Sequence, residues 1–102
     1  MSVVVQEVFG GVAGVTQQVG PTFQYSASPW RILAMFGAGT GTVTLKCGVS
    51  PNVYTILEDT FTDERILPTV DNPFPITVGN SVVTCELTAG CAVRLVYEDN
   101  IG

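Results

Sequence analysis

Apolar and polar residues alternate with a period of two along most of this chain. In "GTVTLKC" the side chains of Val43, Leu45 and Cys47 point one way, while the Thr and Lys residues between them point the other. The stretches "SVVTCELT" and "CAVRLVYE" show the same alternation. Alternation is typical of β-strands that cover a core with one face, and the 3.6-residue period of amphipathic helices is almost absent. The pattern therefore predicts an all-β fold.

Glycine, proline and short polar stretches separate the expected strands. "GAGTG", residues 37–41, is interpreted as a hairpin turn, and "VSPN" as a proline turn. "TVDNPFP" predicts a rigid loop, because Pro73 favours an extended Asn72. The acidic residues 58–67 are interpreted as an exposed loop, with a single helical turn as the alternative.

The pattern predicts eight or nine strands, which suits a compact antiparallel β-sandwich or jelly-roll-like barrel with an extended N-terminal segment. "RILAMFG", residues 31–37, is apolar on both faces, so we expect a central strand or one that an interface covers. The other strands are expected at residues 3–8, 15–19, 41–48, 53–58, 74–78, 81–88 and 91–98.

Two of the three cysteines, Cys85 and Cys91, flank the turn "LTAG". Pairing Leu87 with Cys91 leaves a three-residue hairpin loop, in which Gly90 takes the left-handed conformation, and places the apolar residues of both strands on one face. The two thiols are then diagonal neighbours with Cβ atoms about 7–8 Å apart, too far for an undistorted disulfide. A zinc site lacks ligands, since Cys47 is the only other thiol and histidine is absent, and C-x5-C is not the usual redox spacing. We expect all three cysteines to be buried as small apolar residues.

Composition and charge narrow the classes of function. Only 13% of the 102 residues are charged and 46% are hydrophobic, so much of the surface of this single domain is neutral or apolar, which favours association. The four basic residues are scattered and the net charge is −5, which argues against binding to nucleic acid or to anionic membranes. No targeting or membrane-spanning segment is recognisable. An odd number of cysteines favours a reducing cytoplasm.

No catalytic arrangement is recognisable. The lack of histidine removes the commonest general base, and the carboxylates of residues 58–64 do not match a calcium-binding loop. We therefore expect neither enzymatic activity nor a cofactor or metal. The rings of Tyr25, Trp30 and Tyr54 form the one alternative of another class, an aromatic platform for stacking on sugars.

The first 29 residues differ from the rest of the chain. They contain no base and a single acid, and glycine, glutamine and serine are spread through them. We interpret residues 1–29 as edge strands or as a docking arm, and residues 30–102 as the sandwich body. If this part of the chain docks on a partner, its exposed apolar residues and the single tryptophan form the interface: Val3, Val4, Val5, Phe9 and Trp30.

The body also resembles a known class of proteins. "GTGTVTLKCGVSPNVYTIL" followed by "VVTCELTAGCAVRLVYED" is similar in layout to small β-sandwich proteins of tailed bacteriophages, with "SPN" in place of the usual Asp-Gly turn. Such proteins occur as capsid decoration or cement subunits and as tail or fibre-attachment components. The resemblance implies a homo-oligomeric virion protein, assembled in the host cytoplasm, whose partners are the major capsid protein or tail proteins. It implies no catalytic residues.

Overall fold

The computed structural model describes residues 2–20, 30–67, 76–78 and 82–99. In these residues the chain forms nine strands and no helix, which confirms the predicted all-β sandwich. The strands are β1 (Ser2–Phe9), β2 (Val15–Val19), β3 (Trp30–Gly39), β4 (Gly41–Cys47), β5 (Tyr54–Phe61), β6 (Arg65–Leu67), β7 (Ile76–Val78), β8 (Val83–Leu87) and β9 (Cys91–Asp99).

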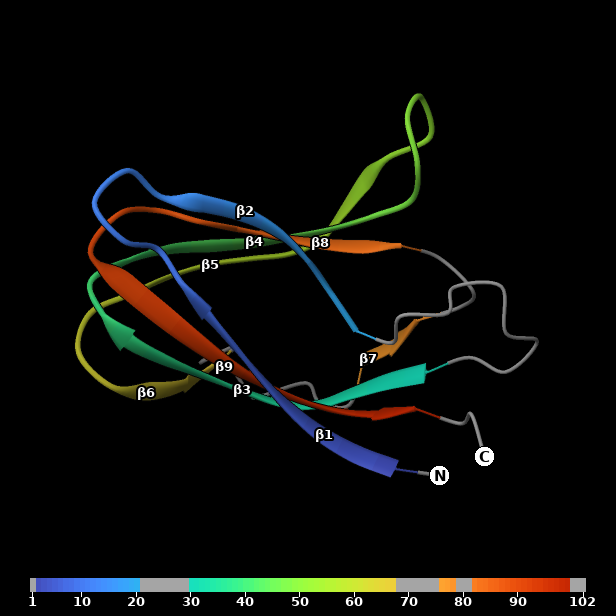
Figure 1. Cartoon of the computed structure of the whole chain (residues 1–102), viewed down its shortest axis with the longest axis horizontal. Helices are drawn as coiled ribbons and strands as arrows, with labels where there is room; N and C mark the ends of the chain where they lie inside the picture. The colour runs from blue at the N-terminus through green and yellow to red at the C-terminus, as the bar shows by residue number, and fades with distance from the viewer. Residues whose placement is uncertain (1, 21–29, 68–75, 79–81, 100–102) are drawn as a thin grey trace.

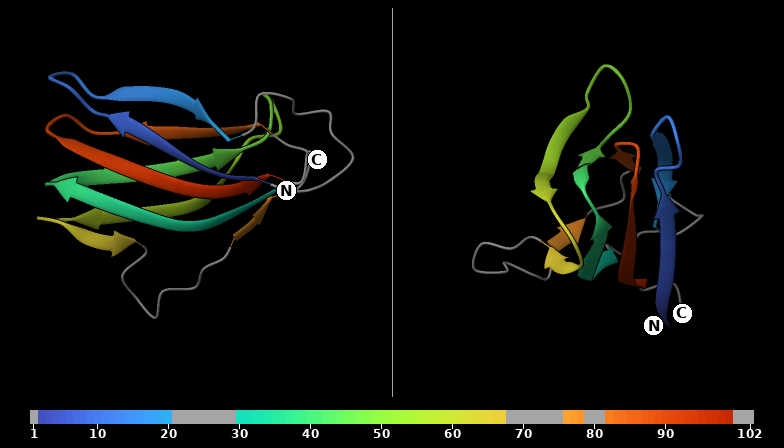
Figure 2. Two further views of the ribbon diagram at one scale, coloured as in Figure 1. Left: turned by 60° about the horizontal axis from the view of Figure 1, so that its bottom comes forward. Right: turned by 90° about the vertical axis from the view of Figure 1, so that its left-hand side faces the viewer.

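The strands form two antiparallel sheets that pack face to face (Figures 1 and 2). One sheet has the order β1-β9-β3-β6, and β7 pairs with β3 beside it; the other has the order β2-β8-β4-β5. Strands that follow one another in the chain mostly lie in opposite sheets, so the chain crosses the core repeatedly. Two four-stranded sheets in this order are the arrangement of a jelly roll, with β7 as an addition.

The N-terminal strands belong to both sheets. β1 pairs with β9 along its whole length, and β2 pairs with β8. Each is the edge strand of its sheet. Residues 2–20 are therefore edge strands of the sandwich, one of the two arrangements expected for this segment, whereas residues 21–29 lie outside the described part.

The inward faces of the two sheets form one apolar core. Trp30 packs edge-on against Tyr97, with ring centroids 5.4 Å apart. Gly37 of β3 lies under the ring of Phe61, which comes from the opposite sheet. The buried residues are Val8, Val19, Trp30, Ile32, Met35, Val43, Leu45, Cys47, Phe61, Leu67, Val83, Cys85, Leu87, Cys91, Val93, Leu95 and Tyr97.

A β-bulge explains why β3 reads as apolar on both faces. Ile32 pairs with Tyr97 and Ala34 with Val96, so Leu33 is an extra residue. The bulge shifts the alternation, and the buried positions change from Trp30 and Ile32 to Met35 and Gly37. β3 is also central, with β9 on one side and β6 and β7 on the other, as expected for residues 31–37.

The connection after β8 corrects the predicted hairpin. Thr88–Gly90 separates the two strands and Gly90 is left-handed, with φ 86°, as predicted. However, β8 and β9 lie in different sheets, so Leu87 does not pair with Cys91. "GAGTG" is also no hairpin turn, because β3 and β4 lie in opposite sheets and only Thr40 separates them. A sheet-crossing connection satisfies the same alternation, because both strands still turn their apolar residues toward the core.

Two further predictions concern the stretch around β5. The proline turn is confirmed, since β4 and β5 pair and the Asn52 N–H donates to the Val49 carbonyl at 2.9 Å. The loop predicted at residues 58–67 is wrong: β5 extends to Phe61 and β6 begins at Arg65. Phe61 and Leu67 are buried, and their burial holds this acidic stretch in the sheets. The predicted loop "TVDNPFP" lies outside the described residues.

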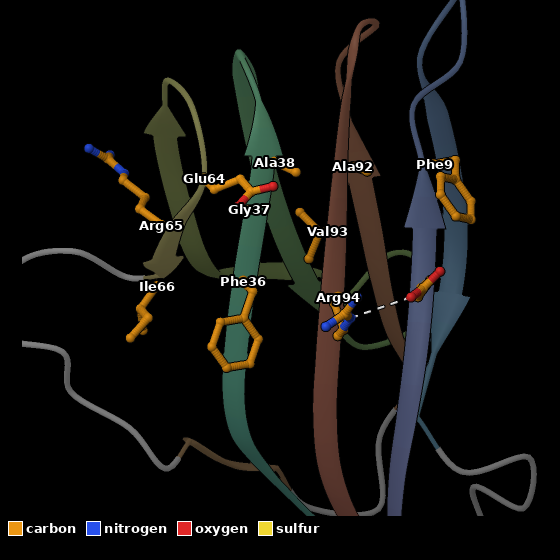
Figure 3. A pocket seen from close by; sticks show the side chains of 11 residues that line it. Phe9, Phe36, Gly37, Ala38, Glu64, Arg65, Ile66, Ala92, Val93 and Arg94 are labelled. Atoms are coloured by element: carbon orange, nitrogen blue, oxygen red, sulfur yellow. Dashed lines mark hydrogen bonds and ion pairs between the residues drawn. The ribbon is translucent and has the colours of Figure 1, made fainter.

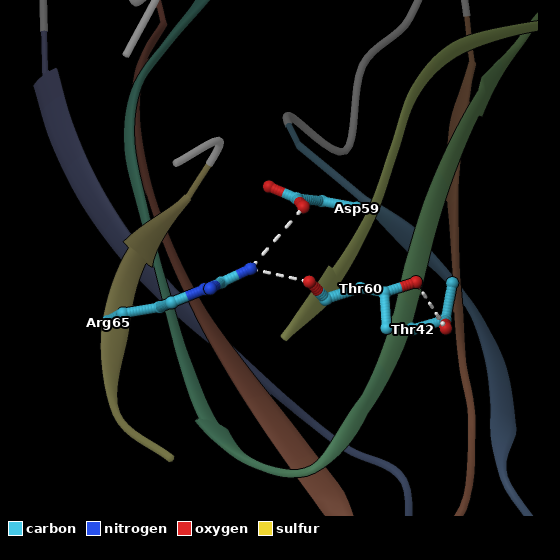
Figure 4. A network of polar contacts seen from close by, with 4 residues as sticks. All are labelled: Thr42, Asp59, Thr60 and Arg65. Carbon is cyan, nitrogen blue, oxygen red and sulfur yellow. Dashed lines mark hydrogen bonds and ion pairs between the residues drawn. The ribbon is translucent and has the colours of Figure 1, made fainter. Parts of the chain in front are cut away.

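Polar side chains connect the two sheets at both sides of the sandwich. At one side, Gln6 of β1 donates to the Gln18 carbonyl of β2 at 3.4 Å and accepts from the Gly20 N–H at 3.0 Å. At the other side, Arg65 of β6 donates to the Thr60 carbonyl of β5 and lies 3.7 Å from the Asp59 carboxylate (Figure 4). These contacts hold together the edges that no strand pairing joins.

Candidate interaction surface

The outer face of the β1-β9-β3-β6 sheet carries most of the large exposed apolar residues of the described chain. In β1 the odd-numbered residues point outward, and the side chains of Val3, Val5 and Phe9 are 62%, 58% and 63% exposed. Phe36 of β3 and Ile66 of β6 pair across the sheet and are 38% and 50% exposed. Residues 2–9 and residue 66 are distant in sequence, yet the strand order brings them to one surface.

Small and branched apolar residues complete this surface between its larger members. Val96 of β9 lies between Val5 and Ala34, and Ala92 lies between Phe9 and Ala38. The result is an apolar array that spans the four strands, with the Glu7–Arg94 pair between Val5 and Phe9. We call it the outer apolar face, and it consists of Val3, Val5, Phe9, Ala34, Phe36, Ala38, Ile66, Ala92 and Val96.

A groove of about 500 Å³ lies on one half of this face (Figure 3). Phe9 stands at one side of it, and Phe36 and Ile66 stand at the other. Between them, Arg94 of β9 lies 3.3 Å from the Glu7 carboxylate of β1. The groove therefore has aromatic and aliphatic side chains at its sides and an ion pair between them, and Glu64 also lines it.

Charges on the outer apolar face are compensated in pairs. Besides Glu7 and Arg94, Arg31 lies 3.5 Å from the Glu98 carboxylate. These pairs are partly exposed, so their contribution to folding stability is small, about 0–1 kcal/mol each. Their larger effect is that the four charges of these two pairs are not desolvated as isolated ions when a partner covers this part of the sheet.

The outer face of the other sheet has a different character. Cross-strand neighbours there are mostly threonine, and Lys46 pairs with Glu86 at 2.7 Å. The outward threonines are Thr16, Thr42, Thr44, Thr55, Thr60 and Thr84. Threonine has a high strand propensity and a hydroxyl that water can bind, so this face suits solvent.

The structure separates the residues predicted for a partner interface. Val3, Val5 and Phe9 lie on the outer apolar face, whereas Val4 points inward and is half-buried against the core. Trp30 is 3% exposed and lies in the core, so its indole does not form a surface contact. The same burial corrects the aromatic platform: Tyr54 is exposed, Trp30 is not, and Tyr25 lies outside the described residues.

Sequence reasoning did not place Phe36, Ile66 and Val96 on this surface. A signal existed for Phe36, because residues 31–37 are apolar on both faces and a covering interface was one of the two explanations. Ile66 lies in the stretch predicted as an exposed loop, and the alternation of residues 91–98 predicts which residues face the core but not what lies beside Val96 on the other face. Only the strand order shows that these three residues share a surface with β1.

The cysteines occupy the core, as predicted. Cys47, Cys85 and Cys91 are free thiols and are at most 7% exposed. Burial raises the pKa of the Cys85 thiol from 9.0 to about 12, and the neighbouring Cys91 and Glu86 add to the shift. Cys85 therefore stays protonated at neutral pH, where a thiol is a poor nucleophile and a poor metal ligand.

The described residues contain neither a cluster of three or more metal-ligating side chains nor a helix able to span a bilayer. Comparison of the chain with family models, with curated proteins and with solved structures finds no match.

Proposed function

We propose that this chain is a non-enzymatic structural subunit of a virus particle, and that its outer apolar face packs against neighbouring virion proteins as a capsid decoration or cement subunit does. The observation that carries the proposal is the concentration of Val3, Val5, Phe9, Phe36 and Ile66 on one face. Monomeric proteins seldom leave a contiguous apolar array of this kind exposed to water.

The chemistry of the face supports a protein partner. Protein interfaces have an apolar centre enriched in aromatic side chains, with polar groups around it. Phe9 and Phe36 supply the aromatic side chains, and the Glu7–Arg94 and Arg31–Glu98 pairs supply compensated charge. A cofactor or small substrate instead binds in an enclosed concave site, whereas this groove lies open on the outer face of a sheet.

The strand order adds weaker support. Jelly rolls form the capsid proteins of many viruses, but they also occur in lectins and cupins, so the fold alone does not define the function. Burial of Trp30 removes the observation that favoured sugar binding. The major capsid protein is the partner we favour, and a tail or fibre protein is the alternative within the same particle.

The test uses particles purified from a host that expresses the tagged chain. Copies per particle are counted by quantitative mass spectrometry for wild type and for the double variant Phe9→Ser/Ile66→Ser. Burial of one large apolar side chain contributes about 1.5–3 kcal/mol, so loss of two lowers incorporation more than tenfold. The matched control is Val12→Ser/Val49→Ser, which removes two exposed apolar residues that lie outside the face.

Two results would contradict the proposal. One is absence of the wild-type chain from density-purified particles. The other is a folded Phe9→Ser/Ile66→Ser variant that incorporates as well as wild type. Localisation of the tag by electron microscopy then assigns the subunit to the head or to the tail.

A further inference from the structure

The four sheet edges of the sandwich differ in how well they are protected against pairing with another strand. β6 and β7 are three residues each, and β2 has five. β5 has eight residues, but it carries a register irregularity at Ile56 and two acids, Glu58 and Asp59. Short length, bulges and charge are the usual devices that keep an edge from pairing.

β1 is neither short nor bulged, and it carries a single charge. It is eight residues long, pairs with β9 without any register shift, and contains neither proline nor lysine. Its one charge, Glu7, is paired with Arg94. A long, regular and apolar edge strand of this kind is an expected site of strand pairing.

The hydrogen-bond pattern shows which backbone groups of β1 are open. The Gly10 N–H donates to the Cys91 carbonyl at 2.8 Å, in the same register as the β1–β9 ladder. In an antiparallel ladder, bonded pairs alternate with pairs whose N–H and C=O groups point away from the partner strand. The even-numbered residues of β1 therefore bond β9, and the N–H and C=O groups that no described strand pairs with belong to Val3, Val5, Glu7 and Phe9.

The charge distribution favours a second copy at this edge. Each of the four bases is paired with an acid, through Arg31–Glu98, Lys46–Glu86, Arg65–Asp59 and Arg94–Glu7. The net charge of −5 therefore comes from the remaining five acids. Of these, Glu58, Asp63 and Glu64 lie on β5 and the connection to β6, at the side of the sandwich opposite β1 (Figure 2). Asp99 lies at the end of β9 beside Ser2, away from the middle of β1, and Asp71 is outside the described residues.

We propose that two copies of this chain associate through antiparallel pairing of their β1 strands across a twofold axis perpendicular to the sheet. Such an interface is self-complementary, because each copy offers the same strand in the opposite direction. The pairing satisfies the open N–H and C=O groups of β1. It also joins the β1-β9-β3-β6 sheets of both copies, so that the two outer apolar faces lie side by side on one surface of the dimer.

The test is sedimentation equilibrium of the purified wild-type chain and of Val5→Pro. Proline removes the N–H of Val5, which points to the open side, and leaves the bonds of β1 to β9 in place. Wild type is expected at twice the 10.8 kDa chain mass, and Val5→Pro is expected to raise the dissociation constant at least tenfold. Val5→Lys, which places a like charge on both copies, is the second variant if the proline variant does not fold. The emission of the buried Trp30 reports folding.

Ile66→Ser is the matched control, since it alters the outer apolar face far from β1 and is expected to leave the dimer intact. Hydrogen exchange gives an independent readout: the odd-numbered amides of β1 gain protection as concentration rises, while the even-numbered amides are protected throughout. A wild-type mass of one chain at every concentration overturns the inference. The inference is also overturned if the Ile66→Ser substitution dissociates the dimer while folded Val5→Pro remains a dimer. The proposed dimer does not depend on the proposed role in a virus particle, so each of the two proposals can be contradicted while the other stands.

Discussion

Replacing Gly37 by alanine tests the packing of the two sheets most directly. Gly37 has ordinary strand geometry on β3, and a Cβ atom there would lie 2.8 Å from Cδ2 and Cε2 of Phe61 and 3.0 Å from Cδ1 of Leu67. Phe61 is 1% exposed and comes from the opposite sheet, 24 residues along the chain (61 − 37 = 24). Because Gly37 has no side chain, the ring of Phe61 fills the space beside its Cα atom.

The magnitudes follow from this contact. An extra methyl in a packed core costs about 1–3 kcal/mol, and we expect Gly37→Ala to lower the free energy of unfolding by that amount. Phe61→Ala creates a cavity and costs about 3–5 kcal/mol. In the double variant the methyl of residue 37 no longer meets a ring. The double variant should therefore be more stable than additivity predicts, by about 1–3 kcal/mol.

Urea denaturation followed by Trp30 emission measures all four proteins, because this single tryptophan is 3% exposed when folded. Phe61→Leu replaces Phe61→Ala in the cycle if the larger cavity prevents folding. The reasoning is refuted if Gly37→Ala is as stable as wild type, or if the two substitutions are additive. Either result would mean that residues 37 and 61 do not meet across the core.

Three further predictions concern other parts of the fold. Gly20→Ala is expected to lower the free energy of unfolding by more than 1 kcal/mol and to shift Trp30 emission, because φ is +94° and the Cβ would lie 2.5 Å from Cη2 of Trp30. Thermal unfolding measures the first effect and fluorescence the second. Arg65→Met removes the contacts to Asp59 and Thr60 and should cost about 1–2 kcal/mol in thermal unfolding, with Asp59→Asn costing less. The Cys85 thiol has its pKa raised from 9.0 to about 12 in the folded chain, so unfolding releases a proton above pH 9. The free energy of unfolding should therefore fall as pH rises from 9 toward 12, and it should fall less steeply in Cys85→Ala. Urea midpoints measured from pH 7 to pH 10 test this, and the same pH dependence in wild type and Cys85→Ala would contradict it.

Local strand structure could be predicted from the sequence because it depends on neighbouring side chains. The period-two alternation around Val43 and Val83 and the β-branched residues of β2 placed most strands within one or two residues of their observed bounds. The left-handed Gly90 was also predictable, because a tight turn between strands favours glycine at a position with positive φ, whether or not the strands pair. These features follow from backbone geometry within a few residues.

Strand pairing could not be predicted, because alternation defines which face is buried and says nothing about which sheet a strand joins. Leu87 and Cys91 point to the core whether their strands form a hairpin or face each other across the sandwich. The stretch with Asp59 and Glu64 was misjudged for a related reason. Its charges suggested a loop, but Phe61 and Leu67 are buried, and their burial outweighs the local preference for solvent.

The candidate surface was only partly predictable for the same reason. Val3, Val5 and Phe9 stood out as apolar residues near the start of the chain, and the structure leaves all three exposed. Phe36 and Ile66 join them only through the order β1-β9-β3-β6. A surface assembled from four strands is a property of the pairing, and no single stretch of sequence contains it.

The outer faces of the two sheets expose different kinds of side chain. If scarce charge were spread evenly, both sheets would expose similar side chains. Instead, the β2-β8-β4-β5 sheet presents threonines and the Lys46–Glu86 pair, which hold strand geometry while binding water, and the β1-β9-β3-β6 sheet presents Phe9, Phe36 and Ile66. Five of the nine large exposed apolar residues of the described chain thus share the outer face of the sheet that also contains the edge strand β1. A partner that covers this one sheet removes Val3, Val5, Phe9, Phe36 and Ile66 from water, and the threonine face remains in solvent.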